Sequence, residues 1–171
     1  LGKEIYLISD EPYRELVYDG NKEDFLTKYY RNTIVGYSFS KSLSLPGERI
    51  GYVVVPDEVE NADQVIDGIV VSNRTLGFVN APSLLQKAVA KCLDEKTNLE
   101  FYDENRKMLY EGLQKLGFHC IKPEGAFYMW VKSPDADEEK FVAAGKKYNI
   151  IMVKGSAFGC AGYVRLAYCV S

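Results

Sequence analysis

A polar connection between two apolar runs holds the residues with the most evident chemistry. It reads SFSKSLSLPGER over residues 38–49, and it places Lys41 after Ser38 and Ser40 and eight residues before Arg49. A turn needs little beyond the Pro-Gly pair of this stretch. The amine, the hydroxyls and the forked guanidinium are instead groups that hold an anion such as phosphate.

A nucleotide is not the favoured source of that phosphate. A P-loop has glycine six residues before its lysine and again immediately before it, whereas Lys41 has Val35 and Ser40 at those positions. A lysine amine that is kept neutral can form a Schiff base with an aldehyde. Pyridoxal phosphate carries both an aldehyde and a phosphate, and its ring nitrogen requires a carboxylate beside it.

Asp10 is the carboxylate that the neighbouring elements would bring to such a ligand. The run IYLIS at residues 5–9 is a continuous apolar segment of the kind buried on both faces of a parallel sheet, and Asp10 follows at its carboxyl end. Ligands of open α/β sheets gather at that edge. Tyr13, three residues further on, would reach the same ring.

The hydrophobic periodicity predicts an α/β first part and an α+β second part, divided between residues 96 and 97. Further elements expected in the first part are a helix at 23–31, strands at 32–39 and 49–56, and helices within 61–73 and 81–95. Those expected in the second part are a long helix at 99–117, a strand at 126–131, a helix at 137–149, and strands at 150–153 and 163–170.

Composition excludes several functional classes. A net charge of -3 and a pI near 5.3 argue against partners such as nucleic acid or an anionic membrane surface, and no apolar run has the length of a membrane span. The four cysteines show no C-x-x-C spacing and there is one histidine, so neither a metal site nor a disulfide framework is expected. Free thiols in a reducing cytoplasm are the favoured interpretation.

Two motifs together resemble a known family. SDEPY is followed about thirty residues later by SFSKSLSLPGERIGY, and this combination is similar to the fold-type I aminotransferases of class I and II, the aspartate aminotransferase superfamily. The later segments PEGAFYMW and YVRLAY also match the family in order and spacing, so the resemblance covers the whole chain. It implies pyridoxal 5'-phosphate as cofactor. It also implies that residues 1–96 form the C-terminal part of the cofactor-binding large domain, mainly a parallel sheet with helices, and that residues 97–171 form a small α+β domain.

The resemblance also implies a role for each motif residue. Lys41 would attach the cofactor as a Schiff base and move a proton between the substrate Cα and the cofactor C4′. Asp10 would pair with the pyridinium nitrogen, and Tyr13 would hydrogen-bond the phenolic oxygen. The groups expected to hold the phosphate are Ser38, Ser40 and Arg49.

Two further arginines would bind the substrate. Arg165, inside the apolar run YVRLAY, matches the arginine that grips the substrate α-carboxylate with two hydrogen bonds. Arg74 lies 33 residues past Lys41, near where aspartate aminotransferases place an arginine for the distal carboxylate, usually across the dimer interface. The local pattern around Arg74 departs from theirs, and an exposed loop arginine is the alternative interpretation.

The activity implied is transfer of an amino group between an amino acid, with aspartate or another acidic or aromatic donor expected, and a 2-oxo acid. The chain resembles only the C-terminal half of such an enzyme, so the parent protein is expected to be a homodimer and the isolated fragment inactive. Two alternatives share these residues. One is a C–S lyase of the same fold, and the other is an aminotransferase-like sensor domain of a transcription regulator.

Overall fold

The computed structural model describes residues 3–135 and 137–170, and these form two compact units. The first unit comprises the described residues up to Glu15 together with Lys22–Thr97. The second comprises Leu16–Asn21 and the described residues from Asn98 onward. The division at 96/97 stays a prediction about domains, and Leu16–Asn21 belongs with the second unit although it lies early in the sequence.

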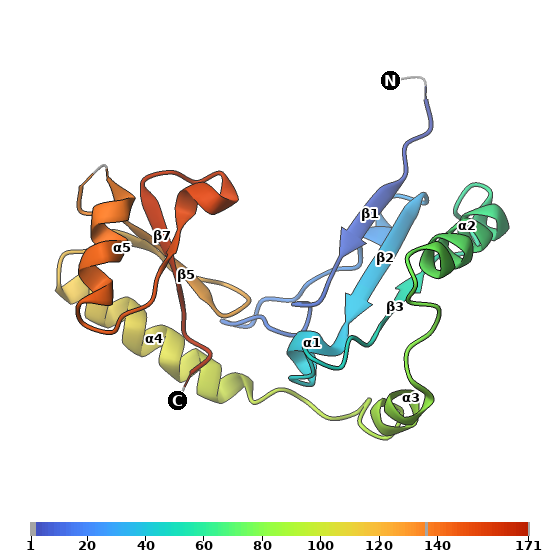
Figure 1. The fold of residues 1–171 in the computed structure, drawn as a ribbon, viewed down its shortest axis with the longest axis horizontal. Helices are drawn as coiled ribbons and strands as arrows, with labels where there is room; N and C mark the ends of the chain where they lie inside the picture. Colours follow the sequence, from blue (N-terminus) through green and yellow to red (C-terminus); the bar gives the residue numbers. More distant parts are fainter. Residues whose placement is uncertain (1–2, 136, 171) are drawn as a thin grey trace. The chain divides into compact units, whose positions relative to one another are not determined.

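The first unit is built on a three-stranded mixed sheet. Its order is β1 (Leu7–Asp10), β2 (Thr33–Ser38) and β3 (Gly51–Val54), with β2 in the middle (Figure 1). The β1–β2 pair is parallel and the β2–β3 pair is antiparallel. The parallel register sets Asp10 opposite Gly36, and the antiparallel register sets Ser38 opposite Gly51. Both strands that carry site residues therefore end at the same edge of the sheet.

The expectation that the segment at 5–9 is buried on both faces is wrong for this chain. The strand begins at Leu7, and Ile8 is 73% exposed. Only β2 pairs with it among the described residues, because β1 is an edge strand. The central strand β2 is the buried one, as shown by Thr33, Ile34 and Val35.

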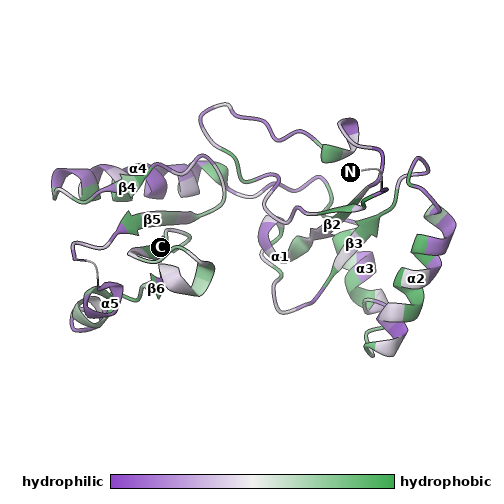
Figure 2. Cartoon of the chain, turned by 90° about the horizontal axis from the view of Figure 1, so that it is seen from above, coloured by the Kyte–Doolittle hydropathy of each residue, from purple (hydrophilic) through white to green (hydrophobic). Residues whose placement is uncertain are grey.

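The first unit also contains several helical segments. They are the 3₁₀ turn η1 (Leu26–Lys28), α1 (Phe39–Ser42), α2 (Ala62–Thr75) and α3 (Ser83–Val89). The helix expected at 23–31 is reduced to the single turn η1. Helix α2 mixes hydrophilic and hydrophobic residues along its length (Figure 2), as expected of a surface helix.

The second unit has an antiparallel sheet of order β4 (Cys120–Ile121), β5 (Tyr128–Lys132), β7 (Tyr163–Ala167) and β6 (Val153–Lys154). Its helices are α4 (Leu99–Lys115), α5 (Glu138–Lys146) and the 3₁₀ turn η2 (Gly155–Phe158). Met129 and Val131 lie on the same face of β5 and are buried in a hydrophobic core together with Val164 of the neighbouring strand β7. Strand β5 is accordingly hydrophobic in Figure 2.

A buried arginine fastens the early segment Leu16–Asn21 into this unit. Arg106 of α4 has no exposed side-chain surface, and its Nη1 and Nη2 donate to the two carboxylate oxygens of Asp19 at 3.0 and 2.8 Å. It also donates to Asp103 and to the Pro123 carbonyl. Its guanidinium lies over the Tyr18 ring, 4.5 Å from the centroid. Ion pairing and hydrogen bonding together satisfy this buried charge.

Within the described ranges, no helix has the length and apolar character required to cross a membrane.

Candidate active site

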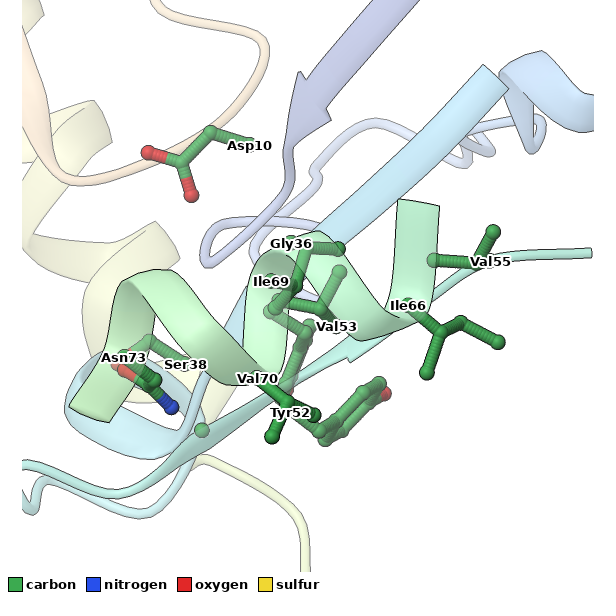
Figure 3. A pocket seen from close by; sticks show the side chains of 12 residues that line it. Asp10, Gly36, Ser38, Tyr52, Val53, Val55, Ile66, Ile69, Val70 and Asn73 are labelled. Atoms are coloured by element: carbon green, nitrogen blue, oxygen red, sulfur yellow. The ribbon is translucent and has the colours of Figure 1, made fainter. Parts of the chain in front are cut away.

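Asp10 stands at the carboxyl end of β1, beside Gly36 of β2. Because Gly36 has no side chain, the space next to Asp10 is open: a Cβ placed there would lie 4.0 Å from Asp10 Oδ1 and 3.8 Å from the Ser9 carbonyl. Figure 3 shows the Asp10 carboxylate standing clear of its strand at one end of a groove. Across residues 3–135 and 137–170 we find no hydrogen bond to this carboxylate, which leaves both oxygens available to a ligand.

The chain turns directly from β2 into helix α1, and this turn positions the serines and the lysine. Ser38 is the last residue of β2 and caps α1, with its Oγ accepting from the Ser40 backbone N–H at 3.2 Å. The Ser38 and Ser40 hydroxyls lie 2.7 Å apart. Lys41 follows in the same helical turn, with its Nζ 5.4 Å from the centroid of the Tyr13 ring. The amine and the phenol expected to serve one cofactor are thus neighbours.

A buried tyrosine supports this turn from below. Tyr37 donates its hydroxyl to Ser42 Oγ at 2.7 Å, and its ring stacks on Tyr52 with centroids 5.0 Å apart. Burial raises the pKa of Tyr37 to about 12, so the hydroxyl keeps its proton and remains a donor at neutral pH. The residue after Lys41 is therefore tied to the sheet.

Arg49 lies near the same turn, two residues before the start of β3. The neighbouring Ile50 carbonyl accepts from the Phe39 N–H at 3.1 Å, which brings Arg49 beside the start of α1. Arg49 has φ +52°, a left-handed conformation that costs a non-glycine residue about 1–2 kcal/mol. Its Nη1 donates to the Pro46 carbonyl at 3.0 Å, and the side chain is exposed. Strained residues of this kind are concentrated at functional sites.

A groove of about 520 Å³ lies between the sheet and helix α2 (Figure 3). Asp10, Ser38 and Asn73 supply its polar groups, and its walls are aliphatic and aromatic residues of β3 and α2. Sequence reasoning missed Asn73 and Gly36 as lining residues. Two spacings in the sequence could have indicated them. Gly36 lies two residues before Ser38, on the same face of a strand, and Ile66, Ile69 and Asn73 share one face of a helix.

Arg165 lies in the second unit, on strand β7. Its Cζ is 4.1 Å from the centroid of the Tyr128 ring and 4.0 Å from that of the Phe158 ring. The side chain is half-buried, and among the described residues no carboxylate or carbonyl accepts a hydrogen bond from it. Aromatic contact holds a guanidinium without using its N–H groups, so these groups remain available as hydrogen-bond donors.

Arg74 lies in the last turn of α2 and is exposed. It follows Asn73, which lines the groove, but Arg74 itself does not line it. The structure therefore brings Asp10, Tyr13, Ser38, Ser40, Lys41 and Arg49 to one region of the first unit and leaves Arg74 on the surface. The roles of these residues stay predictions.

Comparison with known proteins decides the family. The sequence profile of the family described as "Aminotransferase class I and II" matches residues 2–171. This chain belongs to that family. The expected family and the expected α/β fold class are both confirmed.

Several family members align with nearly the whole chain. The aspartate aminotransferase of Pyrococcus horikoshii is 32% identical over 177 residues, covering 98% of this chain and 44% of that protein. The probable aspartate/prephenate aminotransferase of Aquifex aeolicus is 34% identical, covering 98% of this chain and 45% of that protein.

Solved aminotransferase structures share the fold. One from Eubacterium rectale is 52% identical, with a TM-score of 0.94, and covers 99% of this chain and 43% of its own. A Thermus thermophilus aspartate aminotransferase mutant is 28% identical, with a TM-score of 0.83, and covers 98% and 47%. The chain spans less than half the length of these relatives.

Proposed function

We propose that this chain contributes the lysine-bearing part of a pyridoxal-phosphate-dependent aminotransferase. The observation that carries the proposal is the meeting of three chemical groups at one sheet edge. The carboxylate of Asp10 ends β1, the paired hydroxyls of Ser38 and Ser40 lie where β2 passes into α1, and the amine of Lys41 follows in the same helical turn. Family membership supports the same conclusion.

The residues present fit this cofactor, group by group. Lys41 is the amine for its aldehyde, and Asp10, next to the side-chain-free Gly36, has room for the ring nitrogen. The two hydroxyls 2.7 Å apart, with the Arg49 guanidinium, suit a phosphate. When bound, pyridoxal phosphate supplies an aldehyde that takes up the amino group and a ring that stabilises negative charge at the substrate Cα.

The chain's own residues supply proton transfer and orientation. Lys41 Nζ would remove the proton from the substrate Cα as a general base. It would then deliver that proton to the cofactor C4′ as a general acid. Asp10 would keep the ring nitrogen protonated by its negative charge. Tyr13, beside Lys41, would donate its hydroxyl to the phenolic oxygen. Arg165 would grip the substrate α-carboxylate. Arg74, which is exposed in this chain, would meet a distal carboxylate across the interface of a dimer.

The substrate class follows from these two arginines and from the named relatives. Two cationic groups suit a dicarboxylic amino acid, so aspartate or a similar acidic donor is proposed, with an aromatic donor second, and a 2-oxo acid as acceptor. Relatives carry the names aspartate aminotransferase, aspartate/prephenate aminotransferase and aromatic-amino-acid aminotransferase. The C–S lyase and regulator alternatives receive no support from these relatives.

The proposal extends to a cytoplasmic homodimer. All four cysteines are free thiols, as is usual in a reducing compartment. The first unit exposes apolar side chains such as Val71 and Phe78, which a longer chain or a partner subunit would cover.

Lys41→Ala in the full-length enzyme tests the proposal. Transfer from aspartate to a 2-oxo acid should fall by up to about 10⁴-fold, because the variant loses its proton carrier. Borohydride treatment of the wild type should fix the cofactor on the peptide that contains Lys41, as mass spectrometry would show, and Lys41→Arg is the charge-matched control. Ammonia release in place of a new amino acid would point to the lyase, and trapping on a different lysine would refute the assignment.

A further inference from the structure

The loop at residues 155–162 lies between β6 and β7 and is fastened by one buried carboxylate. Glu138, the first residue of α5, is 7% exposed. Its Oε1 accepts from the Ser156 N–H at 3.0 Å, and its Oε2 accepts from the Gly162 N–H at 2.7 Å. One side chain therefore holds both ends of the loop.

The loop itself has little freedom. The Cys160 N–H donates to the Gly155 carbonyl at 2.9 Å, and a Cβ on Gly155 would meet the Cys160 carbonyl at 2.1 Å. The Gly162 carbonyl accepts from the Ser133 N–H at 2.9 Å, so this end also joins the segment after β5. A change in how Glu138 holds the loop would shift it as a body, because its interior is closely packed.

The loop carries the aromatic ring that touches the substrate arginine. Phe158 lies in this loop with its ring centroid 4.0 Å from Arg165 Cζ, and it packs edge-on against Trp130 at 5.7 Å. Since Arg165 has no hydrogen-bond acceptor among the described residues, its guanidinium is oriented by the rings of Phe158 and Tyr128. The position of Phe158 is thus one of the two ring contacts that orient the N–H groups of Arg165.

We propose that Glu138 is a positioning residue: by clamping the loop at 155–162 it places Phe158 against Arg165, and so orients the Arg165 guanidinium for the α-carboxylate of an amino acid. The proposal rests on the proposed function, in which Arg165 receives that carboxylate. Glu138 touches no reacting atom, and its effect passes through the loop backbone and one ring.

The amide isostere separates this role from simple packing. Glu138→Gln keeps the volume of the side chain, but its NH₂ group would face one of the two backbone N–H donors and leave that donor without an acceptor. Phe158→Leu removes the ring and leaves the clamp in place, and it is safe for folding because Phe158 is 48% exposed. Glu139→Gln is the matched control: Glu139 is the adjacent residue, 71% exposed, and pairs with Lys154 without contacting the loop backbone.

The experiment compares two substrates in the full-length enzyme: the best amino-acid donor and the amine that lacks its carboxylate. Glu138→Gln and Phe158→Leu should each lower kcat/KM for the amino acid about tenfold, mainly through KM, a change of about 1.4 kcal/mol. In both variants, kcat/KM for the amine should stay within about twofold of the wild-type value, since the amine has no carboxylate for Arg165 to bind. Glu139→Gln should leave kcat/KM unchanged for both substrates.

Three results would overturn the inference. An equal loss for amine and amino acid in Glu138→Gln would show only a poorly folded enzyme. An unchanged amino-acid KM in that variant, with Arg165→Lys strongly impaired, would leave the arginine's role intact and remove that of Glu138. A wild-type enzyme that does not transaminate at all would instead refute the proposed function, and the inference with it.

Discussion

The two units of this chain differ in how completely they cover their own sheets. In the second unit the core-facing side chains of the central strands are buried: Met129, Val131 and Val164 are at most 1% exposed. In the first unit every residue of β3 is exposed and α2 contains no buried residue. Ile8 and Val71 are 73% and 62% exposed, although both are apolar.

The residues proposed for chemistry lie mainly on the open unit. Asp10 and Arg49 are exposed, and Lys41 is half-buried. The second unit instead buries two of its charged residues, Arg106 and Glu138, and both are hydrogen-bonded. We therefore expect substitutions of the motif residues in the first unit to affect activity chiefly, and loss of the buried Arg106 in the second unit to affect stability chiefly.

The largest expected effect is that of Asp10→Asn on turnover. In the role proposed for Asp10, the amide could not hold the ring nitrogen of the cofactor protonated. The rate in the full-length enzyme should then fall about 10³-fold, the size of loss seen when one electrostatic partner of a transition state is removed. The urea midpoint should not change, because the Asp10 carboxylate is exposed and has no hydrogen bond among the described residues. A large loss of stability with normal turnover would reverse the comparison.

Arg106→Met should give the next largest effect, this time on stability. The substitution removes the guanidinium from Asp19, Asp103 and the Pro123 carbonyl, which leaves the two carboxylates with Lys122 and Lys107 alone. It should lower the free energy of unfolding by about 3 kcal/mol. Urea unfolding followed by Trp130 fluorescence would measure it, because Trp130 is the only tryptophan of the 171-residue chain and lies in the second unit.

Arg31→Met is the control for that measurement. Arg31 pairs with Glu4 in the first unit, and the two side chains are 61% and 48% exposed. Water and salt screen such a pair, so its removal should leave the urea midpoint unchanged. Both variants are also followed by far-UV circular dichroism, which reports on both units, whereas Trp130 reports on the second. Equal losses in the two variants would mean that the units are covered to the same degree.

Acid should produce the smallest effect, again in the second unit. Hydrogen bonds from Ser156 and Gly162 lower the pKa of Glu138 from its ordinary 4.5, and hydrogen bonds from Arg106 and Lys122 lower the pKa of Asp19. Burial alone would raise the pKa of Asp103, but its bonds to Lys107 and Arg106 lower it from 3.8. Because these folded-state values lie below the unfolded ones, the stabilisation is complete above about pH 4.5 and is lost as the pH falls further.

The measurement is the urea midpoint of Trp130 fluorescence in the 171-residue chain at a series of pH values from 6 downward. Its decline below about pH 4.5 should be shallower in Glu138→Gln, which has no carboxyl to protonate. The first unit has Asp24, whose pKa is lowered by Lys28, but both side chains are more than half exposed and salt should cancel their contribution. A decline as steep in Glu138→Gln as in wild type would assign the acid sensitivity to other carboxylates.

The family, the α/β class and the motif residues at the ends of β1 and β2 could be predicted from the amino-acid sequence alone. Asp10, Ser38 and Lys41 could be found because they are adjacent to apolar runs whose period indicates strands, and strand ends meet at a sheet edge whatever the rest of the fold. Helices α2 and α4 were predictable for the same reason, since their apolar spacing is local.

Only the tertiary structure decided the exposure of β1, the attachment of Leu16–Asn21 to the second unit, and the clamp on the loop beside Arg165. Asp19 and Arg106 are separated by 87 residues, and Glu138 and Gly162 by 24. No periodic pattern links residues so far apart. Folding removes water from backbone donors and charged side chains that become buried. Each buried charge then needs a hydrogen-bond or ionic partner, and only the folded chain decides which distant residue supplies it.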